Sequence, residues 1–303
     1  MNNPIFLSTP ILNRPILIAA FRGWADAQDA ASGALRYIIR VLSATKFAEL
    51  DPEEFFVFTR VRPLVRTDIK GSRTIRWPSN NFYYIQGTDG QRDLILFVGV
   101  EPNLKWKTYS EAILNIGTQF NADSIITLGS LVDRVPHTRD PLITGSSNTR
   151  EIQDVLEHSG IWSSGYQGPT GIGSVLVEMC NKLNLNSSSL WGHSPHYLQA
   201  SPNPKISLAL LKTLELICDI KLPLEELSDA CIAFETQVDK AIGNNEELLS
   251  YVTRLEERYD RTEEKEGSQE LPAPDILIKD LEDFLIQQQR DRDETLGDTP
   301  KNV

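Results

Sequence analysis

The stretch that most constrains the fold is residues 125–128 (IITL), a short apolar, β-branched run that stops at Gly129. A run of this kind, without polar alternation, predicts a strand that is buried on both faces, as in the middle of a parallel sheet. Just beyond it the chain carries His137 and Arg139. Because ligands bind open α/β sheets in the crevice outside the carboxyl ends of the strands, this segment predicts both a fold and a place to look for a site.

Three further apolar runs repeat this arrangement. They cover residues 15–20, 94–98 and 188–191, and each is followed within a few residues by a glycine. Helices are predicted between and after these strands, over residues 25–42, 104–119, 148–158, 170–183 and 205–217. Strands that alternate with helices in this way predict an α/β fold with a mainly parallel sheet that is covered on both faces.

Shorter segments predict that the sheet is mixed. Residues 74–77 and 82–85 have strand character and are separated by turn residues, so we expect a hairpin or meander there. The aromatic-rich residues 55–59 predict one more strand. Residues 130–150 are polar and contain prolines, so we expect them to form a long loop.

The pattern changes after residue 219, where strand signals end. Residues 223–241 and 246–260 have apolar positions at helical spacing and predict a helical hairpin. Residues 275–289 predict an amphipathic helix, with an apolar side formed by Ile276, Leu277, Leu281, Phe284 and Leu285. We therefore expect a core domain over residues 1–220, a helical hairpin packed on it over 221–260, an acidic linker over 261–274, and the amphipathic helix with a disordered acidic end over 275–303.

Charge and composition exclude several partner classes. The net charge is −12, and residues 261–303 contribute half of it with six basic and twelve acidic side chains. An acidic protein repels phosphate backbones, so we expect no nucleic-acid partner. The apolar runs are far shorter than a membrane span needs, and no signal peptide is evident, so we expect no membrane association. Three widely spaced cysteines without a CxxC motif predict reduced thiols in a cytoplasmic protein.

The loops after the glycine-terminated strands carry the residues that are most suited to chemistry. In a parallel sheet these loops lie along one edge, so we expect three of the four histidines to gather near one crevice. The candidate crevice residues are Arg22, Gly23, Trp24, Asp26, Glu101, Trp106, His137, Arg139, Thr170, His193, His196 and Tyr197.

Each of these features has a structural alternative. His137 either serves a pocket or bonds to its own loop or a carbonyl. Arg139 either receives an anion or pairs with an aspartate such as Asp133. Residues 168–171 (GPTG) open a predicted helix, whose free N–H groups suit an anion, although proline at the first turn and glycine for close packing explain the motif equally well.

Motifs for metal binding and nucleophilic catalysis are absent from the sequence. His193 and His196 have a spacing found in zinc sites, but such a site needs further ligands and no cysteine lies nearby in the sequence. No GxSxG or HExxH motif is present. We therefore expect no metal, no cofactor and no assigned catalytic residue.

Seven motifs in a fixed order resemble a known family. They are FRGWADA from Phe21, Arg62-Pro63, GVEPNLKW from Gly99, TLGSLVDRVPHTRD from Thr127, YQGPTGIGSVL from Tyr166, LWGHSPHYLQASPNPK from Leu190 and YVTRLEE from Tyr251. Together they resemble the proteasome assembly chaperone 2 family, and more narrowly its prokaryotic branch, whose members are often of unknown function. The resemblance runs from about residue 15 to residue 260.

The resemblance implies a three-layer αβα domain like that of nucleoside phosphorylases and peptidyl hydrolases. It also implies self-association, with a trimer as the expected state, and it implies no established reaction. The eukaryotic branch chaperones proteasome α subunits, and some archaeal relatives contact the proteasome through a C-terminal hydrophobic-tyrosine-any-residue motif. This chain departs from that motif, because Lys301 and Asn302 stand at the hydrophobic and tyrosine positions.

Two function hypotheses follow. The first is a non-enzymatic scaffold or assembly chaperone that binds protein partners, a proteasome-type assembly among them. The second is a small-molecule enzyme or binder that uses the crevice for a nucleoside, phosphate or carboxylate ligand. In that case Arg22, His137 and Arg139 would hold the anionic group, and His137 or His196 would move a proton. We favour the first hypothesis.

Overall fold

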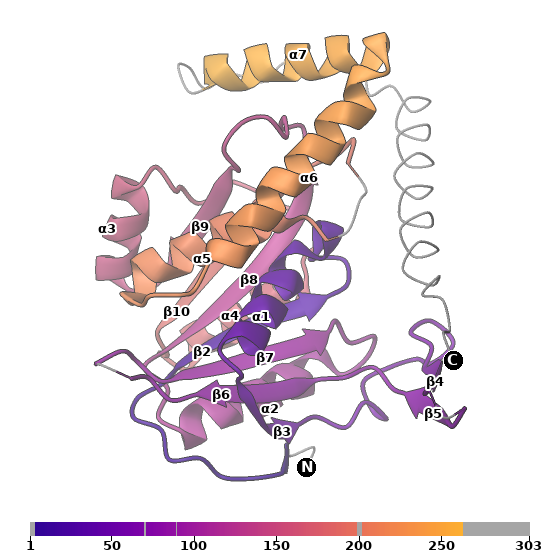
Figure 1. The fold of residues 1–303 in the computed structure, drawn as a ribbon. Helices are drawn as coiled ribbons and strands as arrows, with labels where there is room; N and C mark the ends of the chain where they lie inside the picture. Colours follow the sequence, from indigo (N-terminus) through magenta and orange to yellow (C-terminus); the bar gives the residue numbers. More distant parts are fainter. Residues whose placement is uncertain (1–3, 70, 89, 199–201, 263–303) are drawn as a thin grey trace.

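The fold is organised around one eight-stranded sheet with the order β1-β3-β6-β7-β2-β8-β10-β9 (Figure 1). The computed structural model describes residues 4–69, 71–88, 90–198 and 202–262. The predicted amphipathic helix over 275–289 and residues 263–274 of the predicted linker lie outside the described residues, whereas Arg261 and Thr262 of that linker belong to α7. The strands are β1 (Ile5–Phe6), β2 (Ile16–Arg22), β3 (Thr45–Glu49), β6 (Asn81–Ile85), β7 (Leu94–Val100), β8 (Ser124–Asp133), β9 (Ile143–Ser147) and β10 (Ser187–Pro195).

The four strands that the glycine-terminated runs predict form the parallel centre of this sheet. β2 pairs with β7 on one side and with β8 on the other, and β10 pairs with β8. The flanking strands are antiparallel: β6, β3 and β1 continue beyond β7, and β9 closes the opposite edge against β10. The prediction of a mixed sheet with a parallel centre is therefore confirmed.

Helices cover both faces of the sheet, which gives the three-layer αβα architecture. Alternate residues of a strand point to opposite faces, so Ile16, Ile18 and Ala20 of β2 join one core while Leu17 and Phe21 join the other. The first core contains α1 (Ala30–Val41), α3 (Arg150–His158) and α5 (Pro204–Cys218), and the second contains α2 (Trp106–Gln119) and α4 (Ile172–Lys182). All five predicted helices of this region are present.

Two predictions about the sheet's periphery are wrong. Residues 55–59 form turns, in which Phe55 and Phe56 are buried and donate their backbone N–H groups to the Pro52 carbonyl. The aromatic run is therefore a turn that anchors the second core, with the Phe55 ring 5.0 Å from that of Tyr109. Residues 130–150 are not one long loop, because β8 extends to Asp133 and the polar β9 supplies an edge strand for β10.

A separate two-stranded hairpin, β4 (Leu64–Thr67) and β5 (Arg73–Arg76), stands beside the main sheet (Figure 1). The predicted strand over residues 74–77 is therefore present, but it pairs with β4 and not with the strand over 82–85. β1, β3, β4 and β9 were not predicted. They are short or polar, so the hydrophobic pattern alone gives little signal for them.

The C-terminal region consists of α6 (Glu225–Gly243) and α7 (Glu246–Thr262), which turn at Asn244 and Asn245 as the sequence predicts. Figure 1 shows α6 running over the α1 and α5 face, with α7 set crosswise at its far end. These helices share a third, smaller core with the segment after β10, built from Tyr197, Leu198, Val238, Ile242, Leu248, Tyr251, Val252 and Leu255. None of the helices in the described ranges is long and apolar enough to cross a membrane.

Candidate functional site

The predicted crevice residues fall into two separate groups at the strand ends. One group, His137, Arg139, His193, His196 and Tyr197, lies in or beside the loops after β8 and β10. The other group lies around Glu101, where the loops after β2 and β7 meet the start of α4.

His137 is held in a buried hydrogen-bonded position between α6 and the loop after β10. Its Nδ1 lies 2.6 Å from the Tyr197 hydroxyl and its Nε2 lies 3.0 Å from Oδ1 of Asp239. A neutral imidazole satisfies both contacts, with Nε2–H donating to the carboxylate and Nδ1 accepting from the hydroxyl. Burial lowers the pKa of His137 even though the Asp239 carboxylate opposes this, so the ring is neutral near pH 7.

His193 and His196 flank Asp133 at the end of β8. His193 Nδ1 lies 2.7 Å from Oδ2 of Asp133, and its Nε2 lies 3.1 Å from the Thr144 hydroxyl. The His196 ring lies between the Asp133 carbonyl and the Tyr251 hydroxyl of α7, which is 2.7 Å from Nε2. Burial lowers the pKa of His196. The three histidines thus gather as predicted, but each is engaged with neighbouring protein groups.

Arg139 forms an ion pair with α7. Its guanidinium makes two parallel contacts of 2.7 Å with the carboxylate of Asp260 and lies 3.5 Å from Glu256. Bidentate pairing of this kind is geometrically specific, so Arg139 helps to fix the position of α7. Arg139 thus pairs with an aspartate of the protein and does not wait for an anion, but its partner is Asp260 and not Asp133.

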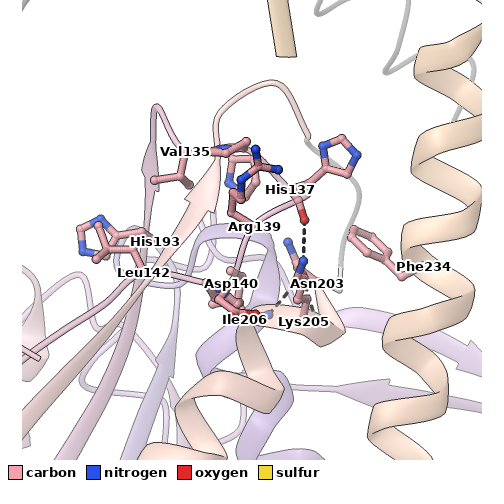
Figure 2. Close-up of a pocket in the computed structure, with 13 residues that line it drawn as sticks. Val135, His137, Arg139, Asp140, Leu142, His193, Asn203, Lys205, Ile206 and Phe234 are labelled. Carbon is pink, nitrogen blue, oxygen red and sulfur yellow. Dashed lines mark hydrogen bonds between the residues drawn. The ribbon is translucent and has the colours of Figure 1, made fainter. Parts of the chain in front are cut away.

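The space beside this group is too small for a ligand. The pocket lined by His137, Arg139 and His193 has a volume of about 10 Å³, which is no more than one water molecule needs. Figure 2 shows the Lys205 side chain of α5 reaching the His137 carbonyl, a contact of 2.6 Å, with Phe234 of α6 nearby. The histidine loops therefore serve chiefly as the attachment site of α6 and α7.

The second group is organised by the Glu101 carboxylate. Its Oε1 accepts the N–H of Ile172 at 3.0 Å, and its Oε2 accepts the N–H of Trp24 at 3.3 Å. Glu101 therefore occupies the amino end of α4, where the helix dipole favours a negative charge. The anion site suggested by the GPTG motif is filled by this internal carboxylate, which also fixes the Trp24 loop.

The remaining candidates have local structural contacts. Asp26 is buried and accepts the N–H groups of Ala31 and Ser32, so it caps α1; burial raises its pKa despite these hydrogen bonds. Arg22 is exposed and lies 3.9 Å from Asp29. The Trp106 indole donates to the Pro102 carbonyl at 2.7 Å.

An open hollow of about 810 Å³ lies next to the Glu101 group. Its lining comes from Trp24, the end of β8, the middle of β10, β9, the segment over residues 163–171 and α4. Within the described part of the chain, no lining residue is charged and none is a histidine; serines, threonines, glycines and apolar side chains make up the surface. Of the predicted residues only Trp24 and Thr170 line it.

Three aromatic side chains give the hollow its character. Trp24 and Tyr166 project outward and are 62% and 63% exposed, whereas Trp191 lies on β10 beside Gly129 of β8. A methyl group on Gly129 would come within 2.7 Å of the Trp191 ring, so glycine is needed there for the ring to lie flat against the sheet. Gly129, which ends the apolar run over residues 125–128, thus leaves room for the Trp191 ring beneath the hollow.

Chemical groups suited to catalysis are not assembled in the hollow. The three cysteines are buried and unpaired, and burial raises the pKa of Cys180 and Cys231 to about 11 and that of Cys218 to about 12. Among the residues that the structure describes, no group of three His, Cys, Asp or Glu side chains is arranged to hold a metal ion. Tyr166, with its large exposed ring, is the kind of side chain that is enriched in protein-recognition surfaces. Sequence reasoning missed Tyr166 and Trp191, although both lie inside the quoted motifs.

The fold is thus a three-layer αβα body to which α6 and α7 are attached. Its candidate site is an open hollow that is lined by aromatic and uncharged side chains. The PAC2 family model matches residues 20–242, and the chain belongs to this family. A search of curated proteins gives no match.

Solved structures of other proteins resemble this chain in fold. A PAC2 family protein from Streptomyces avermitilis is 35% identical, with a TM-score of 0.71 over 78% of this chain and 99% of that one. The Mycobacterium tuberculosis proteasome-assembly chaperone homologue Rv2125 is 31% identical, with the same TM-score and coverage. The archaeal proteasome activator PbaB of Pyrococcus furiosus is 20% identical, with a TM-score of 0.63 over 79% of this chain and 99% of that one, and shows the fold alone.

Proposed function

We propose that this protein is a non-enzymatic assembly chaperone that binds a protein partner through the hollow beside Trp24 and Tyr166. The observation that carries the proposal is the hollow itself, which is large, open and uncharged and exposes two aromatic side chains. Tyrosine and tryptophan are enriched in the energetically dominant centres of protein interfaces, where one side chain contributes much of the binding free energy.

The rival hypothesis, an enzyme or binder for an anionic small molecule, lacks support from the geometry. Arg139 is paired with Asp260, and His137 is buried between Tyr197 and Asp239. The cavity beside them has a volume of about 10 Å³, and no described residue that lines the large hollow is charged. Among the residues that the structure describes, a nucleoside, phosphate or carboxylate would therefore meet no free cation at either place.

The description of one relative supports a partner that is a subunit of a larger protein assembly. One relative above 30% identity is described as a proteasome-assembly chaperone homologue. We infer the same class of partner here, a protein subunit bound before or during assembly.

A pull-down from the native host tests this proposal. Wild-type protein should recover a protein partner in stoichiometric amount, and Trp24→Ala combined with Tyr166→Ala should reduce that recovery at least tenfold, a loss of about 1.4 kcal/mol of binding free energy or more. The matched control is Trp162→Ala, because Trp162 is 60% exposed on the same segment but does not line the hollow. Equal recovery by both variants would contradict the proposal.

A further inference from the structure

The β4–β5 hairpin has an electrostatic character opposite to that of the whole protein. We call the surface formed by residues 60–69 and 71–77 the arginine hairpin. It carries five exposed arginines in a chain whose net charge is −12: Arg60, Arg62, Arg66, Arg73 and Arg76. None of these five forms an ion pair or hydrogen bond through its side chain with another residue in the described part of the chain.

Apolar side chains are exposed between these arginines. The register pairs Val65 with Ile75, which are 63% and 60% exposed, and places Arg73 on the same face of the hairpin. The opposite face carries Leu64, also exposed, with two more arginines. All eight residues of the two strands are exposed, so neither face is covered by the described body of the protein.

The hairpin is held in shape from its two ends. At its base the Phe58 and Trp77 rings lie 4.9 Å apart, and at its turn the Asp68 carboxylate accepts the N–H of Ser72 at 2.8 Å. A two-stranded hairpin is only marginally stable in water unless a face is packed. An ordered hairpin that presents arginines and β-branched side chains on both faces therefore suits a ligand that combines carboxylates with an apolar side.

The chain itself contains a segment with this chemistry. Beyond Thr262, residues 263–303 hold twelve acidic and five basic side chains. Within them, residues 275–289 place an apolar side next to four carboxylates, those of Asp275, Asp280, Glu282 and Asp283. We propose that residues 275–289 bind the arginine hairpin, with their apolar side on Val65 and Ile75 and their carboxylates at the arginines.

Charge complementarity and covalent linkage favour this occupant over other anions. Residues 263–274 can span up to about 40 Å at 3.3–3.6 Å per residue, so the linker lets the segment bind well away from α7, on the hairpin of its own chain or on that of a neighbouring copy. A tethered segment has an effective concentration in the millimolar range, so it outcompetes a free anionic partner of similar intrinsic affinity. This inference is independent of the proposed role of the hollow, because the two surfaces share no residue.

Disulfide trapping in the full-length protein tests the pairing. Ile75→Cys combined with Leu281→Cys should cross-link under mild oxidation several-fold faster than a control pair, Leu249→Cys with Leu281→Cys. Leu249 is exposed on α7, whereas the native cysteines are buried and will not compete. A product of one-chain mass shows that the segment binds its own hairpin, and a two-chain product shows that it binds a neighbour; either supports the proposal.

Charge reversal makes the test specific. Adding Arg73→Glu, on the same face as Val65 and Ile75, should slow the cross-link several-fold, and adding Glu282→Lys and Asp283→Lys to that variant should restore it. Circular dichroism checks that each variant is folded. Cross-linking no faster than the control pair, or no response to the charge changes, would overturn the proposal. Arginine-dependent binding of wild-type protein to anionic vesicles or RNA, with cross-linking at the control rate, would assign the hairpin to that other ligand.

Discussion

At the scale of single residues, hydrogen bonding decides which candidate side chains are available for function. His137, His196 and Glu101 are of residue types that are common in functional sites. All three, however, form hydrogen bonds that join segments distant in the sequence. Trp24 and Tyr166, by contrast, expose most of their surface to solvent. The aromatic side chains at this strand edge are therefore the ones left open to a partner, and our proposal places function on them, whereas these three titratable side chains are engaged within the protein.

The first prediction concerns pH. Burial lowers the pKa of His137 and His196 below the ordinary value of 6.5, so below that pH the unfolded state binds protons that the folded state does not. The free energy of unfolding should therefore fall as the pH drops through the range between 6.5 and the lowered folded values, and these two groups should contribute no pH dependence above it. Urea unfolding at several pH values from about 5.5 to 7.5 measures the slope.

The control for the pH prediction removes the two rings. A His137→Gln, His196→Gln double variant should show a shallower slope over the same pH range than the wild-type protein. Asp239, Glu235 and Lys205 face His137, and Asp133 and Arg134 lie near His196, so the residual slope reports on those groups. A slope that the double substitution leaves unchanged would show that these histidines are not the titrating groups.

The second prediction concerns Glu101. Glu101→Ala leaves the N–H groups of Ile172 and Trp24 without their acceptor, and it should lower the free energy of unfolding by about 1–3 kcal/mol. Glu111→Ala, at an exposed position of α2, should change it little. Denaturant titration compares the two, and equal effects would argue against a capping role for Glu101.

At the scale of elements, α6 joins the first core through Leu227, and the rest of α6 and α7 is held by polar contacts and the small third core. Leu255 is fully buried in that core, whereas Leu249 on the same helix is half exposed. Leu255→Ala should therefore cost about 2–5 kcal/mol of unfolding free energy, and Leu249→Ala should cost little. Hydrogen exchange should locate the loss in α6 and α7. If exchange in the sheet rises equally, the third core is not a separate unit.

The elements also show what sequence reasoning can and cannot find. The four central strands were predictable because both faces of each are buried, which gives continuous apolar runs such as residues 125–128. β9 was not, because a single isoleucine followed by Thr, Gly and Ser gives no hydrophobic pattern, and the strand forms by pairing with β10. The gathering of the histidines was predictable from topology, but their contacts with α6 and α7 were not, since His137 pairs with Asp239 and His196 with Tyr251, which lie 102 and 55 positions away.

At the scale of the whole molecule, the protein combines an αβα body, the two helices α6 and α7, and the β4–β5 hairpin beside the main sheet (Figure 1). Membership of the PAC2 family supports the expectation of self-association, and we propose a homotrimer. Light scattering at micromolar concentration should give three times the mass of one 34.1 kDa chain. A monomer mass would contradict the proposal.

The central claim is that the hollow beside Trp24 and Tyr166 binds a protein partner. Its most direct test is the amount of partner recovered by three proteins prepared alike: wild type, the Trp24→Ala, Tyr166→Ala variant, and the Trp162→Ala control. The account predicts stoichiometric recovery with wild type and with Trp162→Ala, and at least a tenfold loss with the double variant. Full recovery by a folded double variant would contradict it.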